Sequence, residues 1–95
     1  MSATYGWMPD NPPPPIAGVF GLDMADILLH HQTGETERAD RYDLRGTELD
    51  RDEVMWLRGV AETARHVGAR ELLTDAEELI EAILKHGSII LVVER

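Results

Sequence analysis

Apolar positions near the C-terminus first follow a helical period and then form a continuous run. Between residues 74 and 86 they recur at the three- and four-residue spacing of a helix with one buried face. Thr74 is a good N-cap, Glu77 completes a capping box, and Gly87 supplies a terminal glycine. Residues 89–93 are rich in β-branched side chains, which is typical of a buried strand. The sequence therefore predicts a helix followed by a C-terminal strand. The apolar positions of that helix are Ala76, Leu79, Ile80, Ile83 and Leu84.

A second helical pattern precedes the first and has its own start and stop signals. Asp50 is a good N-cap, Glu53 occupies the capping-box position, and Gly68 ends the pattern. Residues 69–73 form a short connection, so we expect the two helices to pack as an antiparallel pair. The apolar side chains that share one arc of this helix are Val54, Trp56, Leu57, Val60, Ala61, Ala64 and Val67.

Two residues depart from the pattern of this second helix. Met55 falls among the charged side chains, which makes it a candidate for an exposed apolar contact. Gly59 lies in mid-helix, where glycine is about 1 kcal/mol less favourable than alanine. A glycine at such a position often marks the close approach of another backbone.

Residues 22–33 fit two structures. A helix capped by Asp23 would place Met24, Ile27 and Leu28 on one face. Alternatively, the second half of this segment is a strand, which would lead through a glycine-containing loop into a second strand over residues 36–44. We favour this hairpin, because the C-terminal strand needs a neighbour in a sheet. If residues 22–33 are helical, the C-terminal strand must pair with the N-terminal arm or with a second copy of the chain.

The N-terminal arm, residues 1–15, carries four consecutive prolines at positions 12–15. They favour an extended polyproline II conformation. One interpretation is a ligand for an aromatic-lined groove. We favour a stiff arm that lays Tyr5 and Trp7 against the core of the domain. The predicted fold is a small α+β domain over residues 16–95, with an antiparallel sheet of about three strands packed on a two-helix antiparallel hairpin, and a proline-rich arm in front.

Charge narrows the classes of partner. The 95 residues include nine basic and eighteen acidic side chains, which gives a net charge of −9. This balance disfavours contact with nucleic-acid phosphates and with anionic membranes, and it favours a basic protein partner. The absence of cysteine excludes disulfides and thiolate metal sites. Without a signal peptide or a spanning apolar run, we expect a cytoplasmic protein. Eight arginines against one lysine indicate a GC-rich coding background, typical of many bacteria and phages.

Histidines and hydroxyl groups give no familiar catalytic or metal-binding pattern. His30 and His31 are adjacent, so their rings point in different directions, and no pair of histidines has the helical spacing of a zinc site. His66 and His86 lie in the last turns of the predicted helices, which favours a structural role. Ser88 lies outside any nucleophile motif. We therefore expect no enzyme activity, no cofactor and no metal.

The helix pair also invites comparison with a helix-turn-helix. Acidic side chains occupy the helix that would have to enter DNA, so we expect no direct contact with nucleic acid. These side chains are Asp75, Glu77, Glu78 and Glu81.

An acidic segment leads to the functional hypothesis. Residues 35–53 contain eight acidic and four basic side chains. We expect a non-catalytic acidic protein-binding module, and more specifically an inhibitor that occludes a basic surface, as small immunity proteins or phage-encoded blockers do. The candidate partner-binding residues are Asp40, Asp43, Glu48, Asp50, Asp52, Glu53 and Met55.

Two alternatives use other residues. The first is a homo-oligomeric structural or accessory protein whose C-terminal strand is a sheet edge and pairs with a copy of itself. The second is a small enzyme or ligand-binding domain that uses His30 or His31 with a carboxylate from residues 35–53. The oligomer interface would consist of Ile89, Ile90, Leu91, Val92 and Val93.

Overall fold

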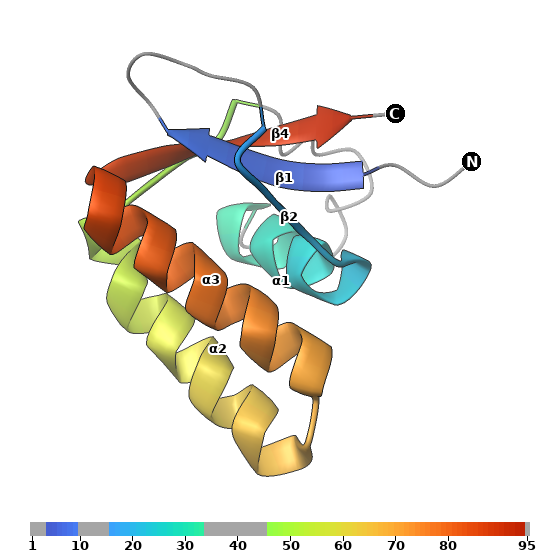
Figure 1. The fold of residues 1–95 in the computed structure, drawn as a ribbon. Helices are drawn as coiled ribbons and strands as arrows, with labels where there is room; N and C mark the ends of the chain where they lie inside the picture. Colours follow the sequence, from blue (N-terminus) through green and yellow to red (C-terminus); the bar gives the residue numbers. More distant parts are fainter. Residues whose placement is uncertain (1–3, 10–15, 34–45, 95) are drawn as a thin grey trace.

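The predicted α+β architecture is present in the computed structural model, which describes residues 4–9, 16–33 and 46–94. Within these residues the chain forms four strands and three α-helices (Figure 1). In chain order the elements are β1 (Thr4–Pro9), β2 (Gly18–Phe20), α1 (Leu22–Thr33), β3 (Glu48–Asp50), the short 3₁₀ helix η2 (Arg51–Glu53), α2 (Val54–Val67), α3 (Arg70–His86) and β4 (Ser88–Glu94).

The four strands form one antiparallel sheet in the order β2-β1-β4-β3. Trp7 of β1 lies opposite Leu91 of β4, and Leu49 of β3 lies opposite Ile89. Because β4 has a neighbour on each side, the prediction that it is an edge strand is wrong. The physical reason is that the N-terminal residues supply the strand that β4 needs. The residues expected at an oligomer interface, Ile89, Ile90, Leu91, Val92 and Val93, all belong to this interior strand.

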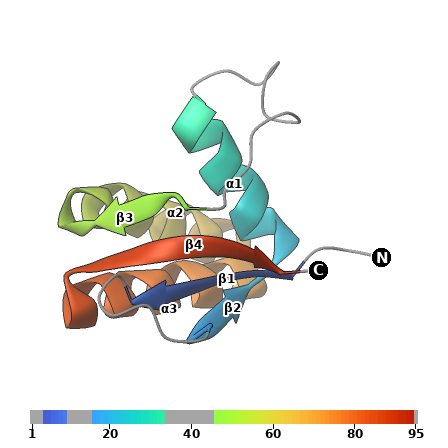
Figure 2. The ribbon, with the colours of Figure 1, turned by 90° about the horizontal axis from the view of Figure 1, so that it is seen from above.

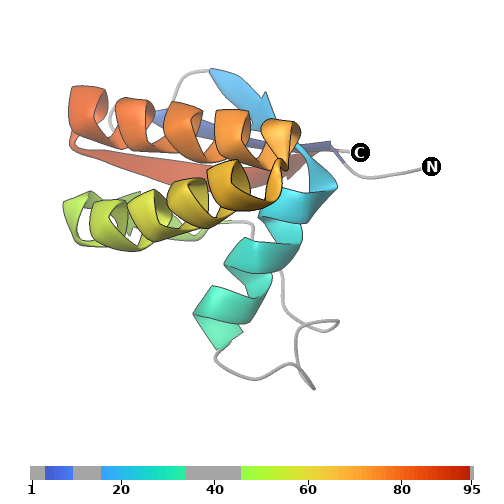
Figure 3. The same ribbon diagram turned by 90° about the horizontal axis from the view of Figure 1, so that it is seen from below.

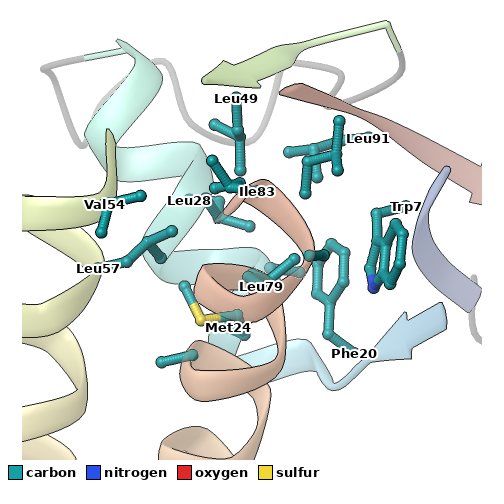
Figure 4. Packing of buried hydrophobic residues seen from close by; sticks show 14 of the residues in the cluster. Trp7, Phe20, Met24, Leu28, Leu49, Val54, Leu57, Leu79, Ile83 and Leu91 are labelled. Atoms are coloured by element: carbon teal, nitrogen blue, oxygen red, sulfur yellow. The ribbon is translucent and has the colours of Figure 1, made fainter. Parts of the chain in front are cut away.

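The helices lie on one face of the sheet, with α2 and α3 side by side and α1 next to them (Figures 1 and 3). The view from above shows the strands in front and the helices behind them (Figure 2). The buried apolar side chains meet between these two layers (Figure 4). The largest fully buried ones are Met24, Leu28, Leu49, Leu57, Leu79, Ile83, Ile89 and Leu91.

Residues 22–33 form the helix α1, so the favoured hairpin is wrong. Met24 and Leu28 are four residues apart and both are fully buried, as expected for one helical face. The hairpin was favoured because β4 needs a neighbour, and β1 meets that need. The alternative in which the C-terminal strand pairs with the N-terminal arm is confirmed. The second strand of the hairpin, over residues 36–44, lies outside the described residues.

Part of the predicted arm belongs to the sheet. Trp7 in β1 is buried, and Tyr5 packs against the core with its ring 6.1 Å from that of Phe20 in β2. The expectation that Tyr5 and Trp7 pack against the core is therefore confirmed. The prolines at positions 12–15 lie outside the described residues.

The boundaries of α3 differ from the prediction at one end. The helix starts at Arg70, one turn before the expected N-cap Thr74, because Gly68 ends α2 in the left-handed region (φ 78°) and a two-residue turn suffices. Leu72 and Leu73 then pack against the core from the first turn of α3. At the other end Gly87 (φ 88°) closes the helix, as predicted.

Candidate functional site

An acidic surface lies at one edge of the sheet, where β3 is the last of the described strands. Its side chains alternate: Glu48 and Asp50 are exposed, whereas Leu49 between them is fully buried. Asp52 continues the exposed acidic surface into η2. We refer to Glu48, Asp50 and Asp52 as the acidic face. The burial of Leu49 orients the face, because it commits the two flanking carboxylates to the opposite side of the strand.

Asp50 also has a structural role in this face. Its backbone is extended (φ −119°, ψ −168°), and its Oδ1 accepts a hydrogen bond of 2.9 Å from the Asp52 backbone N–H. Asp50 therefore caps η2, which leads directly into α2, whereas α2 itself has Glu53 at its N-cap position and no capping side-chain hydrogen bond, so the predicted cap of α2 is wrong. The Glu53 side chain contacts His31. An acceptor at position 50 is thus needed for the local structure, whether or not it is charged.

The charge of this region is concentrated. Residues 48–53 contain four acidic side chains and Arg51, which together give a net charge of −3. Met55 lies one turn further on in α2 and is 82% exposed, which confirms its prediction as an exposed apolar side chain. The other two acidic candidates, Asp40 and Asp43, lie outside the described residues. The described candidates therefore come together at the junction of β3, η2 and α2.

A second cluster joins α1 to the start of α2. The Nε2 atom of His31 lies 2.8 Å from Oε2 of Glu53, and the imidazole stacks on the Trp56 indole with 3.7 Å between ring centroids and 12° between planes. A carboxylate from residues 35–53 and His31 are therefore in contact, as the third hypothesis required. Neighbouring His30 lies 3.8 Å from a different carboxylate, Asp26. The helical period predicts Trp56 on the buried arc of α2, and no local pattern in the sequence indicates its stack on His31.

This cluster has the geometry of a tether between helices. Both hydrogen-bonded side chains are partly covered, the His31 side chain being 32% exposed and that of Glu53 27%. The stack holds one face of the imidazole against Trp56, and the carboxylate holds its Nε2 edge. Such an arrangement fixes α1 relative to α2. We therefore interpret it as structural.

Replacing His31 by alanine is expected to lower the free energy of unfolding by about 1 kcal/mol, because both the stack and the hydrogen bond are lost. Urea unfolding followed by circular dichroism measures this value. In a double-mutant cycle with Glu53→Gln, we expect the double variant to lose less stability than the sum of the losses in the two single variants. His66→Ala, at an exposed position in the last turn of α2, is the matched control and should change stability by less than about 0.5 kcal/mol. Equal effects of the two histidine variants would show that the tether contributes nothing.

A groove between α2 and α3 is lined by charges of both signs, together with the apolar Ile80 and Leu84. Arg65 on its α2 wall lies 2.9 Å from Glu62 and 3.8 Å from Glu77 across the groove. Because three basic and three acidic side chains line it, this groove offers no surplus of one sign to a partner.

No protein-family model, curated protein or solved structure matches this chain. In the part of the chain that the structure describes, no three histidine, aspartate or glutamate side chains gather closely enough to hold a metal ion. None of the described helices has the length and apolar character needed to cross a membrane.

Proposed function

We propose that this protein is a non-catalytic acidic binding module whose acidic face occludes a basic surface on a partner protein. The observation that carries the proposal is the exposure of Glu48, Asp50 and Asp52 at the edge of the sheet. A buried neighbour orients two of these carboxylates, and a capping hydrogen bond holds one of them. A rigid backbone that presents several carboxylates reduces the entropy lost when a partner binds.

Electrostatics gives this face a role in both encounter and recognition. The net charge of −9 attracts a basic protein over several ångströms, and the local charge of −3 at residues 48–53 orients it. Met55, three residues after Asp52, offers an exposed apolar side chain beside the face. A basic partner with a small apolar spot beside its positive charges matches this surface. Inhibition follows if the covered surface is the one with which the partner binds its own anionic ligand.

The proposal is tested with the triple variant Glu48→Gln, Asp50→Asn, Asp52→Asn. Asparagine at position 50 keeps the capping acceptor, so this variant removes charge and leaves the fold intact. The wild-type protein is immobilised and incubated with a bacterial lysate at low and high salt. We expect a basic protein to be retained at low salt, with about tenfold weaker binding to the triple variant. High salt should abolish the binding.

The control is a second triple variant on α3, Glu71→Gln, Glu78→Gln, Glu81→Gln. These three side chains are exposed, and both triple variants change the net charge from −9 to −6. If both weaken binding equally, net charge alone is responsible and the acidic face has no special role. If no basic protein is retained at low salt, the proposed function is wrong.

A further inference from the structure

One face of α2 carries a row of uncharged residues that lies at the surface. Met55, Gly59, Thr63 and Val67 are spaced four residues apart and are all exposed. Such a row forms an i±4n ridge of the kind that packs against other helices. Val67 was expected on the buried arc of this helix but is 69% exposed, so that expectation is wrong. We call these four residues the α2 ridge.

An uncharged groove lies beside the middle of the ridge. Its walls come from three helices, and no lining residue is charged, in a protein with 28% charged residues. Apolar side chains therefore continue from the ridge into a depression that another molecule could enter. The lining residues are Ile27, Trp56, Gly59, Val60, Thr63 and Leu72.

Gly59 stands at the point where ridge and groove meet. A Cβ atom placed on it would have no neighbour within 4 Å. Nothing in the described part of the chain therefore requires glycine there, although glycine is less favourable than alanine in mid-helix. The close approach of another backbone, which the sequence led us to expect, is not made by the described chain itself. An external helix would make use of the space.

We propose that the α2 ridge is a self-association surface, on which a second copy of this chain packs its own α2 in antiparallel orientation. A twofold contact requires a self-complementary surface. The ridge is symmetric in position about residue 61. Its outer residues, Met55 and Val67, lie at equal distances on either side of residue 61, and so do its inner residues, Gly59 and Thr63. In the antiparallel pair Met55 of each copy meets Val67 of the other, while Gly59 permits close approach at the centre. Ridges of this type align when the two axes cross at about −50°.

The charges at the two ends of α2 fit this arrangement. Residues 50–53 at its start have a net charge of −2, and residues 65–70 at its end have a net charge of +2. Arg65 is neutralised by Glu62 and Glu77, so exposed Arg70 supplies the rest of the positive charge at this end. Antiparallel packing sets each acidic start near the basic end of the other copy, whereas parallel packing would set like charges together. This complementarity selects a second copy in antiparallel orientation.

Self-association through the ridge goes beyond the proposed binding of a basic partner and does not depend on it. Glu48 and Asp50 lie on β3 and are not part of the ridge, although Met55 borders both surfaces and Asp50 and Asp52 add to the charge at the start of α2. The two processes should also respond to salt in opposite directions. Added salt screens the repulsion between two copies of charge −9, which exceeds the attraction between their oppositely charged helix ends, and should therefore strengthen the dimer, whereas it weakens capture of a basic protein.

The first test is sedimentation equilibrium of the full chain over a range of protein concentrations. We expect a reversible monomer–dimer equilibrium in the wild-type protein. Gly59→Arg should raise the dissociation constant by about 30-fold or more, because its side chain blocks the centre of the contact. The open space at Gly59 allows this variant to fold, which circular dichroism verifies. Thr74→Arg, an exposed position on α3, makes the same charge change away from the ridge and should leave the constant unchanged.

The second test determines the orientation of the two copies. The chain has no cysteine, so Met55→Cys and Val67→Cys introduce unique thiols. A mixture of the two variants should form a mixed disulfide under mild oxidation, and neither variant should do so by itself. In the antiparallel pair two copies of position 55 are about 18 Å apart along the helix, beyond the reach of a disulfide.

Three results would overturn the proposal. One is a monomer at every concentration, and another is a dimer that Gly59→Arg leaves intact. The third is a wild-type monomer whose capture of a lysate protein is lost in Gly59→Arg, because the ridge would then bind a foreign helix.

Discussion

Replacing Trp7 by alanine is expected to lower the free energy of unfolding by about 3–5 kcal/mol. Trp7 is only 8% exposed and lies in β1 opposite Leu91 of β4. The centroid of its indole is also 5.9 Å from that of the imidazole of His86 at the end of α3. Truncation would leave a cavity between the sheet and α3, and neither layer can close it without losing its own contacts. Urea unfolding followed by far-ultraviolet circular dichroism measures the change.

Trp7→Phe is the matched control and should be much less destabilising. Phenylalanine keeps most of the apolar volume, and it removes an indole N–H that is buried without a hydrogen-bond partner among the described residues. An unpaired buried donor costs about 1–3 kcal/mol, which offsets part of the lost packing. If Trp7→Ala changes stability by less than about 1 kcal/mol, residues 4–9 do not form an integral strand.

The elements that sequence predicted well are those specified by neighbours along the chain. Residues 54–67 and the later part of α3 show a helical apolar period, and Gly68 and Gly87 end the two helices at positive φ. The strand after Gly87 follows from its β-branched run. Each of these signals acts within a few residues, so no knowledge of the tertiary fold is needed to read it.

The errors arose where the deciding contact is remote in sequence. Residues 22–33 have local helix features, including Asp23 in the first turn, but the prediction followed the need of β4 for a neighbour. That neighbour begins at Thr4, more than eighty residues away in the chain. The same remote pairing makes β4 an interior strand. In α3, the strong local signal at Thr74 concealed a helix start that depends on packing of Leu72 and Leu73.

The candidate surfaces also divide into features set by nearby residues, which the sequence predicts, and features set by remote contacts, which it does not. Exposure of Glu48, Asp50 and Met55 follows from their place in local patterns, and the structure confirms it. The contact of His31 with Glu53 spans 22 residues and depends on how α1 crosses α2. The α2 ridge was only partly predictable, because the helical period places Val67 on the buried arc, whereas this last residue of α2 is exposed.

Alanine substitution of three glycines should give effects of opposite sign. A Cβ on Gly18 would lie 2.4 Å from Nε1 of Trp7, and one on Gly6 would lie 2.6 Å from the carbonyl oxygen of Gly18. The Trp7 side chain and the Gly18 backbone are both held by the packed sheet, so the added methyl group would force one of these rigid parts to move. We expect Gly6→Ala and Gly18→Ala each to lower the free energy of unfolding by about 1–3 kcal/mol. Thermal unfolding of each variant beside the wild-type protein measures these changes.

Gly59→Ala is the control in this series, and it should raise stability by about 0.5–1 kcal/mol because alanine is the better helix former and its Cβ meets nothing within 4 Å. The measurement is made at low protein concentration, where self-association does not contribute. Loss of stability in Gly59→Ala would mean that a described element approaches this position more closely than the structure shows. A gain in stability would mean that the folded chain itself does not require glycine at position 59, which leaves contact with a second copy as the physical reason for an open site in mid-helix.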